Sequence, residues 1–194
     1  MAQKTIPALP NSYPYNELLL SGKLSAKTRS WRWKHTGLTL LYTSTSTVRE
    51  VAEAHGLEEE AKVAPRMVIV GCGELVTVRK NTSAELRQLA NEFLNHQFVA
   101  RMVDPLDPSF RYEFKNLLRF RTPVPFRPPQ GAVRTFGVPI GVVFAALLGV
   151  GIESAYCTNC KKIVLGKDFR HKALKVTFTC LECDKHIVLS PHGT

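Results

Sequence analysis

Apolar side chains in the middle of the chain recur at the spacing of an α-helix. The apolar positions are Leu86, Leu89, Ala90, Phe93 and Leu94. They fall on one face of a helix with 3.6 residues per turn. Thr82-Ser-Ala-Glu85, directly before them, has the Thr and Glu spacing of a capping box. The pattern predicts a helix that follows Thr82 and buries this stripe in the core.

The C-terminal part of the chain instead alternates apolar and polar side chains with the period of a β-strand. Leu174, Val176 and Phe178 are separated by polar residues up to Cys180. The pattern also predicts short strands at residues 162–165 and 186–189, with a turn at residues 166–168 after the first of them. The last forty residues are therefore expected to form a hairpin followed by a third strand.

The rest of the chain mixes strand and helix patterns. Trp31–Thr47 is rich in residues that favour strands, and Gly71-Cys72-Gly73 separates two apolar runs as a hairpin turn would. Three prolines within the first fifteen residues predict a flexible arm. We therefore expect an α+β fold in three parts: an N-terminal arm at residues 1–15, a basic α+β domain at 16–153 and an appended zinc-ribbon module at 154–194.

Four cysteines near the C-terminus have the spacing of a metal site. They form two Cys-x-x-Cys pairs nineteen residues apart, Cys157 with Cys160 and Cys180 with Cys183. Each pair suits a tight turn that presents two thiolates, so we expect one structural Zn²⁺ in a closed tetrahedral shell, with two disulfides as the alternative. Thiolate ligands require a reducing compartment, and residues 1–14 lack the pattern of a signal peptide. The cytoplasm or the nucleus is therefore the expected location.

The composition is that of a folded and basic protein. Apolar residues make up 44% of the 194 residues, the formal net charge is +10 and the isoelectric point is about 9.6. The largest basic excess lies in residues 61–135, which hold twelve basic and six acidic side chains. A charge of this sign favours nucleic acid, an anionic membrane or an acidic protein as partner, without choosing among them.

One window within this region interleaves cations with aromatic rings. The cations predicted to contact nucleic acid are Arg111, Lys115, Arg119, Arg121 and Arg127. Cations neutralise phosphates, and the aromatic rings between Phe110 and Phe126 could stack on unpaired bases. The alternative is an amphipathic segment that buries its rings and solvates its charges. Trp31-Arg-Trp33-Lys34 is a smaller version of the same pattern.

Two further features are expected to be structural. Phe136–Ile152 carries no charge but contains five Gly or Pro residues, so we expect burial rather than stable membrane insertion, with a self-association surface as the alternative. Cys72 has no visible partner base and is expected to be buried and inert. The sequence shows no recognisable catalytic motif, so a non-enzymatic protein is expected.

The cysteine-containing block resembles a known viral module. The segments Tyr156–Cys160 and Thr177–Leu189 are similar to zinc ribbons and, more specifically, to the zinc module in the small first-frame proteins of sobemoviruses. The shared features are a Cys-Thr-x-Cys turn, a second Cys-x-x-Cys followed by an acidic and a basic residue, and a Val-x-Leu-like strand. The resemblance implies four cysteine ligands and a viral accessory protein that suppresses RNA silencing and aids spread in a plant host.

These observations lead to one main hypothesis and one alternative. The main hypothesis is a zinc-stabilised regulatory or accessory protein that binds nucleic acid, with RNA preferred over DNA because interleaved rings and cations suit single strands. The alternative is a zinc-stabilised interaction or structural protein that forms a homo-oligomer or binds an acidic partner such as a host protein. The salt dependence of nucleic-acid binding would separate the two hypotheses.

Overall fold

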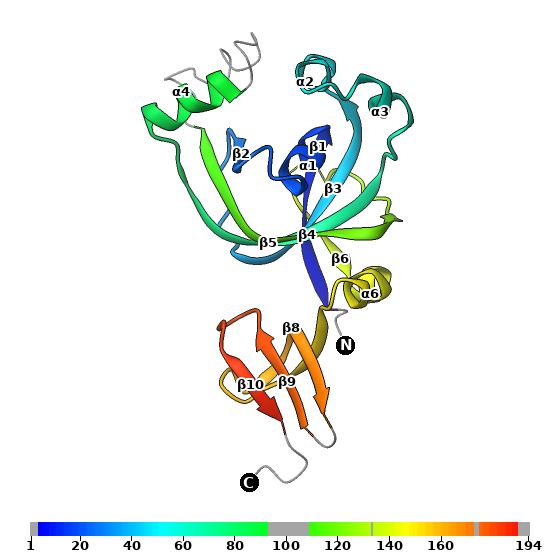
Figure 1. Ribbon diagram of the computed structural model, residues 1–194, viewed down its shortest axis with the longest axis vertical. Coiled ribbons are helices and arrows are strands. Elements are labelled where there is room, and N and C mark those ends of the chain that lie inside the picture. The colour runs from blue at the N-terminus through cyan, green and yellow to red at the C-terminus, as the bar shows by residue number, and fades with distance from the viewer. Residues whose placement is uncertain (1–3, 93–108, 133, 173–174, 190–194) are drawn as a thin grey trace.

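A computed structural model describes residues 4–92, 109–132, 134–172 and 175–189 of the chain. Its strands form a six-stranded sheet and a separate four-stranded sheet, drawn in the upper and lower parts of Figure 1. Five helices accompany the sheets within these ranges. The expected α+β fold is confirmed, and the four C-terminal cysteines lie together in the part of the chain that forms the smaller sheet.

The larger sheet has the strand order β2-β5-β4-β3-β1-β6. Its strands are β1 (Thr5–Tyr13), β2 (Ala26–Arg29), β3 (Gly37–Thr47), β4 (Val68–Lys80), β5 (Phe110–Pro125) and β6 (Phe136–Pro139). The helices are α1 (Tyr15–Leu20), α2 (Arg49–Ala54), α3 (Glu58–Val63), α4 (Ser83–Glu92) and α6 (Ile140–Gly149). β1 pairs parallel with β3, whereas the other neighbouring strands pair antiparallel.

The first strand lies inside the larger sheet rather than in a flexible arm. β1 sits between β3 and β6, and its Ala8 and Leu9 side chains are fully buried. The prediction of an arm at residues 1–15 is therefore wrong for Thr5–Tyr13. Prolines lack the N–H that a strand donates to its neighbour, but here the burial of the intervening apolar side chains outweighs the lost hydrogen bonds.

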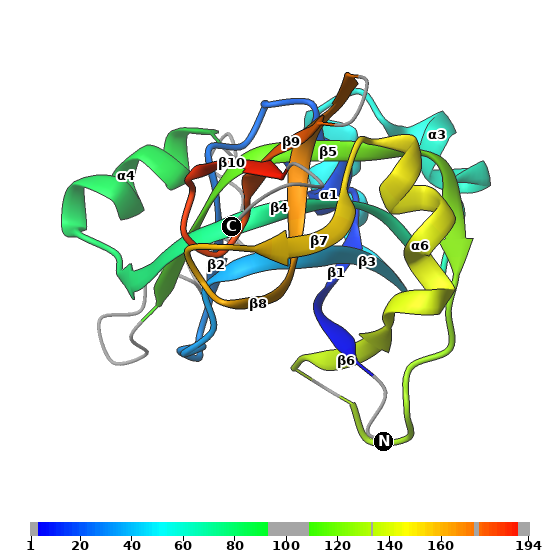
Figure 2. The same cartoon turned by 90° about the horizontal axis from the view of Figure 1, so that it is seen from below.

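Both faces of the larger sheet are covered by apolar side chains. On one face Leu40 and Phe120 pack with Val143 and Leu147 of α6, and Figure 2 shows α6 running along one side of the sheet. On the other face Leu41 packs in a second cluster with Leu19 of α1 and Val70 of β4. The sheet therefore forms the core of the main unit.

The apolar stretch Phe136–Ile152 is only partly buried. It forms β6 and α6, and Val143 and Leu147 of α6 are fully buried. Val142, Phe144 and Leu148 on the outer side of α6 are 43%, 42% and 40% exposed. The expected burial thus applies only to the inner side of this helix. No helix within the described residues is long and apolar enough to cross a membrane.

β4 is one continuous strand where the sequence predicted a hairpin turn. Gly71-Cys72-Gly73 lies in the middle of the strand and faces β5. A Cβ atom on Gly71 would collide with the backbone oxygen of Leu118, so the glycine permits close strand approach rather than a turn. Cys72 is fully buried, and burial raises the pKa of its thiol to about 12, as expected for an inert cysteine.

The helix predicted after Thr82 begins where its capping box places it. α4 starts at Ser83, the backbone N–H of Thr82 donates to Glu85 Oε2 at 2.9 Å, and that of Glu85 donates to Thr82 Oγ1 at 3.3 Å. Phe93 and Leu94, at the end of the predicted apolar stripe, lie outside the described residues.

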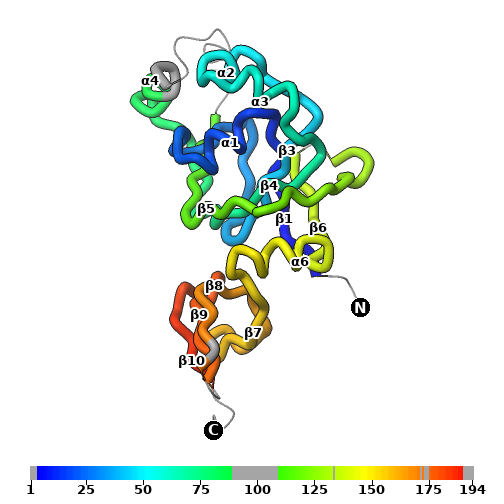
Figure 3. The backbone as a smooth tube through the Cα atoms, turned by 45° about the vertical axis from the view of Figure 1, so that its right-hand side comes forward, coloured from blue at the N-terminus to red at the C-terminus, as the bar shows by residue number. Residues whose placement is uncertain are grey.

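The smaller sheet follows directly from α6, as the tube in Figure 3 shows, and is antiparallel throughout. Its order is β10-β9-β8-β7, with β7 (Glu153–Cys157), β8 (Lys162–Lys172), β9 (Lys175–Cys180) and β10 (His186–Leu189). The turn predicted at residues 166–168 is wrong, because β8 continues through it with a register shift between Lys167 and Arg170. Gly166 instead makes room for the Phe178 ring, which a Cβ atom at this position would hit.

Candidate metal centre and nucleic-acid cavity

Two matching turns bring the four cysteines together beside the smaller sheet. In the first turn the N–H of Lys161 donates to Cys157 O at 2.8 Å, and in the second the N–H of Asp184 donates to Cys180 O at 2.9 Å. Lys161 and Asp184 both adopt left-handed backbone conformations, with φ of 54° and 57°. The two Cys-x-x-Cys turns therefore share one geometry, as the two halves of a zinc ribbon do.

The four sulfur atoms have the separations of a tetrahedral ligand shell. All lie within 4.8 Å of one another; Cys157 Sγ is 3.8 Å from Cys183 Sγ, and Cys160 Sγ is 3.9 Å from Cys180 Sγ. A tetrahedron with Zn–S bonds of 2.3 Å has sulfurs about 3.8 Å apart. All four are free thiols in this conformation, so the disulfide alternative does not describe it. The cysteines predicted as ligands can thus hold one metal ion.

The surroundings of the thiols affect how readily each ionises. The N–H of Cys160 donates to Cys157 Sγ at 3.3 Å, and that of Glu182 donates to Cys180 Sγ at 3.4 Å. A backbone hydrogen bond from Lys185 lowers the pKa of Cys183 to about 7, whereas desolvation raises that of Cys160 to about 12. A metal that binds here must displace protons, so its affinity should rise with pH.

Three of the five cations predicted to contact nucleic acid are paired with carboxylates. The pairs are Arg111–Glu113, Lys115–Asp184 and Arg119–Glu17, with N–O distances of 2.9, 3.2 and 2.6 Å. The pairs connect three different parts of the molecule, because Glu113 lies on β5 itself, Asp184 in the second cysteine turn and Glu17 on α1. These three cations are therefore already engaged by carboxylates of three different segments.

The other two predicted cations are exposed. Arg121 and Arg127 have no ion pair within the described residues. The rings between the cations do not form a stacking surface, since Tyr112 and Phe120 are buried in two different core clusters. The amphipathic alternative therefore describes the rings of β5, while phosphate contact by the five cations stays a prediction.

A cavity of about 420 Å³ beside the larger sheet was missed by the sequence analysis. Its lining includes the guanidinium groups of Arg29 and Arg134, the ring of Trp31, and the hydroxyl side chains of Ser12 and residues 44–46. None of the described residues that line it is acidic. Arg29 is the last residue of β2 and Trp31 follows that strand, whereas Arg134 lies more than a hundred residues later, just before β6. The pattern Trp31-Arg-Trp33-Lys34 therefore pointed to one lining residue, but no local pattern could join Trp31 with Arg134.

Two basic side chains lie on β2: Arg29 lines this cavity, and Lys27 precedes it by two residues. The Arg29 guanidinium donates to the backbone oxygen of Pro10 and to Asn11 Oδ1, while its Nε is buried without a hydrogen-bond partner. Lys27 is 4% exposed, and its Nζ lies 3.1 Å from the centroid of the Tyr15 ring. Burial, reinforced by Arg29, lowers the pKa of Lys27 well below its usual value.

The Arg29 guanidinium at the cavity lacks a compensating carboxylate among the described residues. No ion pair to Lys27 or Arg29 occurs in the part of the chain that the structure describes. A buried charge without a counter-charge is costly, and an anionic ligand would reduce that cost. The site therefore has the charge and the lining to bind an anion.

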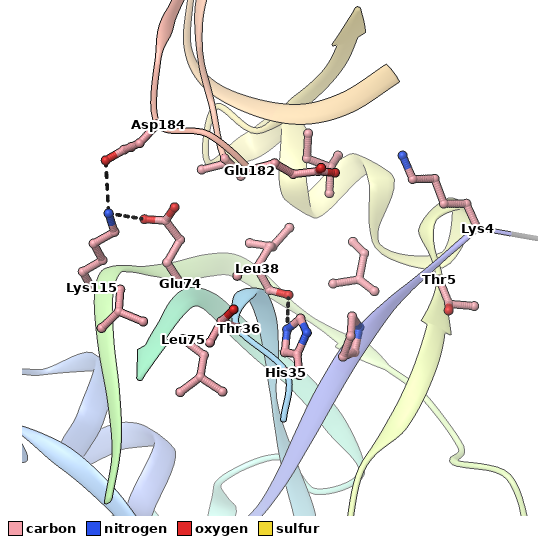
Figure 4. A pocket seen from close by; sticks show the side chains of 16 residues that line it. Lys4, Thr5, His35, Thr36, Leu38, Glu74, Leu75, Lys115, Glu182 and Asp184 are labelled. Atoms are coloured by element: carbon pink, nitrogen blue, oxygen red, sulfur yellow. Dashed lines mark hydrogen bonds and ion pairs between the residues drawn. The ribbon is translucent and has the colours of Figure 1, made fainter. Parts of the chain in front are cut away.

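A second cavity of about 540 Å³ lies between the two sheets and has a different character (Figure 4). Lys115 Nζ lies there between Asp184 Oδ2 at 3.2 Å and Glu74 Oε2 at 3.7 Å. The lining also includes Glu182 and Lys4, so the charges are mixed. These ion pairs connect the second cysteine turn to the larger sheet, and the carboxylates around Lys115 do not favour an anionic ligand.

Comparisons with known proteins give similarity to solved structures but no family. No family model matches the chain, and no curated protein matches it. A crystal structure of ASCH from Zymomonas mobilis superposes with a TM-score of 0.48 at 13% identity, covering 74% of this chain and 94% of that chain. Two single-substitution variants of that protein give TM-scores of 0.46 and 0.45 at 10% and 11% identity; they cover 75% and 76% of this chain, and each match includes 98% of the variant.

Proposed function

We propose that this protein is a zinc-stabilised nucleic-acid-binding protein that prefers RNA. The observation that carries the proposal is the cavity lined by Arg29, Arg134 and Trp31, without an acidic side chain among its described residues. Guanidinium groups bind phosphates in a bidentate manner, and a tryptophan ring offers a surface for a base. The cavity volume is in the range of sites that hold small ligands, so it suits one nucleotide unit of a chain.

The preference for RNA rests on the hydroxyl side chains in the same cavity. Ser12 and residues 44–46 supply both donors and acceptors, and Ser44 Oγ and Ser46 Oγ lie 3.2 Å apart. A ribose 2′-hydroxyl, which DNA lacks, is itself both donor and acceptor. Hydroxyl groups beside a phosphate site therefore favour a ribose over a deoxyribose.

The metal site has a structural role in this proposal. Four thiolates fit Zn²⁺ and fill its tetrahedral shell, so the ion has no coordination position left for a reacting water. The protein would then act by binding rather than by catalysis. Thiolate ligands persist in a reducing compartment, and this supports the cytoplasm or the nucleus as the location in this proposal.

Fluorescence anisotropy with labelled single-stranded RNA, duplex RNA and duplex DNA between 50 and 200 mM salt tests the proposal. Arg134→Gln should weaken binding across sequences and reduce the salt slope by roughly 0.7–0.9, the change for one lost phosphate contact. Arg170→Gln is the matched control, because Arg170 is an exposed arginine on β8, in the other sheet. Wild-type affinity and slope in Arg134→Gln would contradict the assignment of this cavity.

The resemblance of the cysteine block supports a more specific version of this function. In that version the protein is a viral accessory protein that suppresses RNA silencing and aids spread in a plant host. Co-expression with a silenced reporter in leaves would test it, because a suppressor restores reporter expression. Arg134→Gln should then lose suppression together with RNA binding, while Arg170→Gln should retain both.

Self-association is a second candidate function, and the outer side of α6 is the observation that favours it. Val142, Phe144 and Leu148 are about two-fifths exposed on a helix that carries no polar side chain. Light scattering after size exclusion would detect an oligomer, and Phe144→Ser should dissociate it. A monomeric wild-type protein at high concentration would remove this candidate.

A further inference from the structure

The segment between β2 and β3 continues from the Arg29–Arg134 cavity as a row of aromatic rings. Residues 32–36 have no regular secondary structure, and the half-buried Trp31, Trp33 and His35 alternate there with the exposed Arg32 and Lys34. The ring centroids of Trp31 and Trp33 are 6.4 Å apart, and those of Trp33 and His35 are 4.7 Å apart. Trp31 and Trp33 pack with part of their surface against the core cluster around Tyr112 and expose the rest, and each exposed cation is next to a ring in the chain.

The row begins at the cavity and is held in position there. Trp31 lines the cavity, and the guanidinium carbon of Arg134 lies 6.0 Å from its ring centroid. The buried Tyr112 holds Trp31 in place by two contacts. The two ring centroids are 5.5 Å apart, and the Tyr112 hydroxyl donates to the backbone oxygen of Trp31 at 2.7 Å. Rings fixed in this way lose little entropy when a ligand stacks on them.

We propose that Trp31, Trp33 and His35 form a stacking track for single-stranded nucleic acid, with Arg32 and Lys34 as phosphate contacts. The inference rests on the proposed function and names its substrate class, an unpaired strand of about three or four nucleotides that enters the cavity at one end. Each ring accepts the face of any base, so the track selects unpaired bases rather than a sequence. A duplex hides those faces within its own stack.

The far end of the track explains why it is short. His35 lines the cavity between the two sheets, where Figure 4 shows Glu74, Glu182 and Asp184 around the opening. Carboxylates repel phosphates, so a strand cannot continue through this cavity. Burial lowers the pKa of His35, which favours the neutral ring and leaves stacking as its contribution.

Intrinsic fluorescence gives a direct measurement, because the chain contains only two tryptophans and both lie in the track. The probes are uridine oligonucleotides of one, two, four and eight residues, their thymidine DNA counterparts and an RNA duplex of eight base pairs. We expect tryptophan quenching, and affinity that rises from one to about four nucleotides and then levels off. Stronger binding of the uridine series than of the thymidine series is expected from the hydroxyl side chains of the cavity.

Variants separate the track from the cavity. Trp33→Leu should weaken tetranucleotide binding about 5- to 100-fold and leave mononucleotide binding unchanged, while Trp33→Phe should retain most of the affinity. Arg32→Gln with Lys34→Gln should reduce the salt slope by about 1.4. Because both cations are exposed, this double variant tests the track even where Trp33→Leu fails to fold.

The outcomes distinguish this inference from the function on which it rests. If the mononucleotide binds as tightly as the octanucleotide, and both Trp33→Leu and the double variant match wild type, the track is refuted while the cavity remains. Duplex binding as tight as single-strand binding also overturns the track. If none of the probes binds, the proposed function fails together with the track.

Discussion

Removal of one cysteine ligand should unfold the smaller sheet and leave the larger sheet folded. The perturbation is Cys157→Ser, which replaces a thiolate that has three partner sulfurs within 4.8 Å. Apart from cysteines, the buried core of the smaller sheet consists of Val164, Phe178 and Ile187. At about 1.5–3 kcal/mol for each buried side chain, these three contribute about 5–9 kcal/mol.

That contribution is too small to order this sheet without the metal. Fixing the backbone of even ten residues costs about 10–20 kcal/mol, and the four strands of the sheet contain twenty-six. Structural zinc in zinc-finger peptides contributes about 10–16 kcal/mol, which is larger than the apolar core of this sheet. We therefore expect metal binding to decide whether the smaller sheet folds.

The assay combines elemental analysis with amide hydrogen exchange. The wild-type protein should contain one zinc per chain, and Cys157→Ser should contain none and lose protection in β8 and β9. Amides in β3 and β4 should stay protected, because among the described residues of their core cluster only Leu165 and Leu181 come from the cysteine-containing sheet and its turns. Cys72→Ser is the control and should leave the zinc content unchanged. A Cys157→Ser variant that retains one zinc, or protected amides in β8 and β9 after chelation, would refute the reasoning.

Three further changes test individual contacts. Gly166→Val should destabilise the smaller sheet, because any Cβ atom there meets the Phe178 ring; zinc loss at a lower chelator concentration would show it. Lys27→Met should raise the free energy of unfolding at pH 7. The pKa of Lys27 is lower in the folded state than its usual value of about 10.5, so between these two pKa values the unfolded chain binds the proton more readily. The folded state therefore loses stability as the pH falls through this range, and methionine removes that loss. Urea unfolding between pH 7 and 10 should therefore show stability rising with pH in the wild type and a smaller rise in the variant. Glu85→Ala should cost about 1 kcal/mol by removing the capping box and the Arg79 ion pair; an unchanged urea midpoint would contradict this.

The features that the sequence predicted correctly depend on residues close together in the chain. The cluster of four cysteines follows from two Cys-x-x-Cys turns with a hairpin between them, and the start of α4 follows from Thr82 and Glu85, three residues apart. In both cases a short spacing determines the geometry, because the chain between the residues has few conformations available. The charge of β5 was recognised for the same reason, but its carboxylate partners lie on other elements.

The features that the sequence predicted wrongly depend on distant contacts. Prolines indicated a flexible N-terminus, yet β1 is fixed by pairing with β3 and with β6, which lies more than a hundred residues later. Gly166 was interpreted as a turn because a local pattern cannot show that Phe178 packs over it. Arg29 and Arg134 line one cavity only after the larger sheet has formed, so no spacing rule could join them.

The position of β1 between β3 and β6 has a consequence for folding during synthesis. β1 leaves the ribosome before the other strands of its sheet, and β6 follows only after more than a hundred further residues. At translation rates of about 5–20 residues per second, that interval lasts on the order of 6–25 s. Throughout it one edge of β1 lacks its partner, and such an edge is a place where nascent chains aggregate or recruit chaperones. Slowing translation just before β6 should therefore lower the soluble yield more than slowing it after β6.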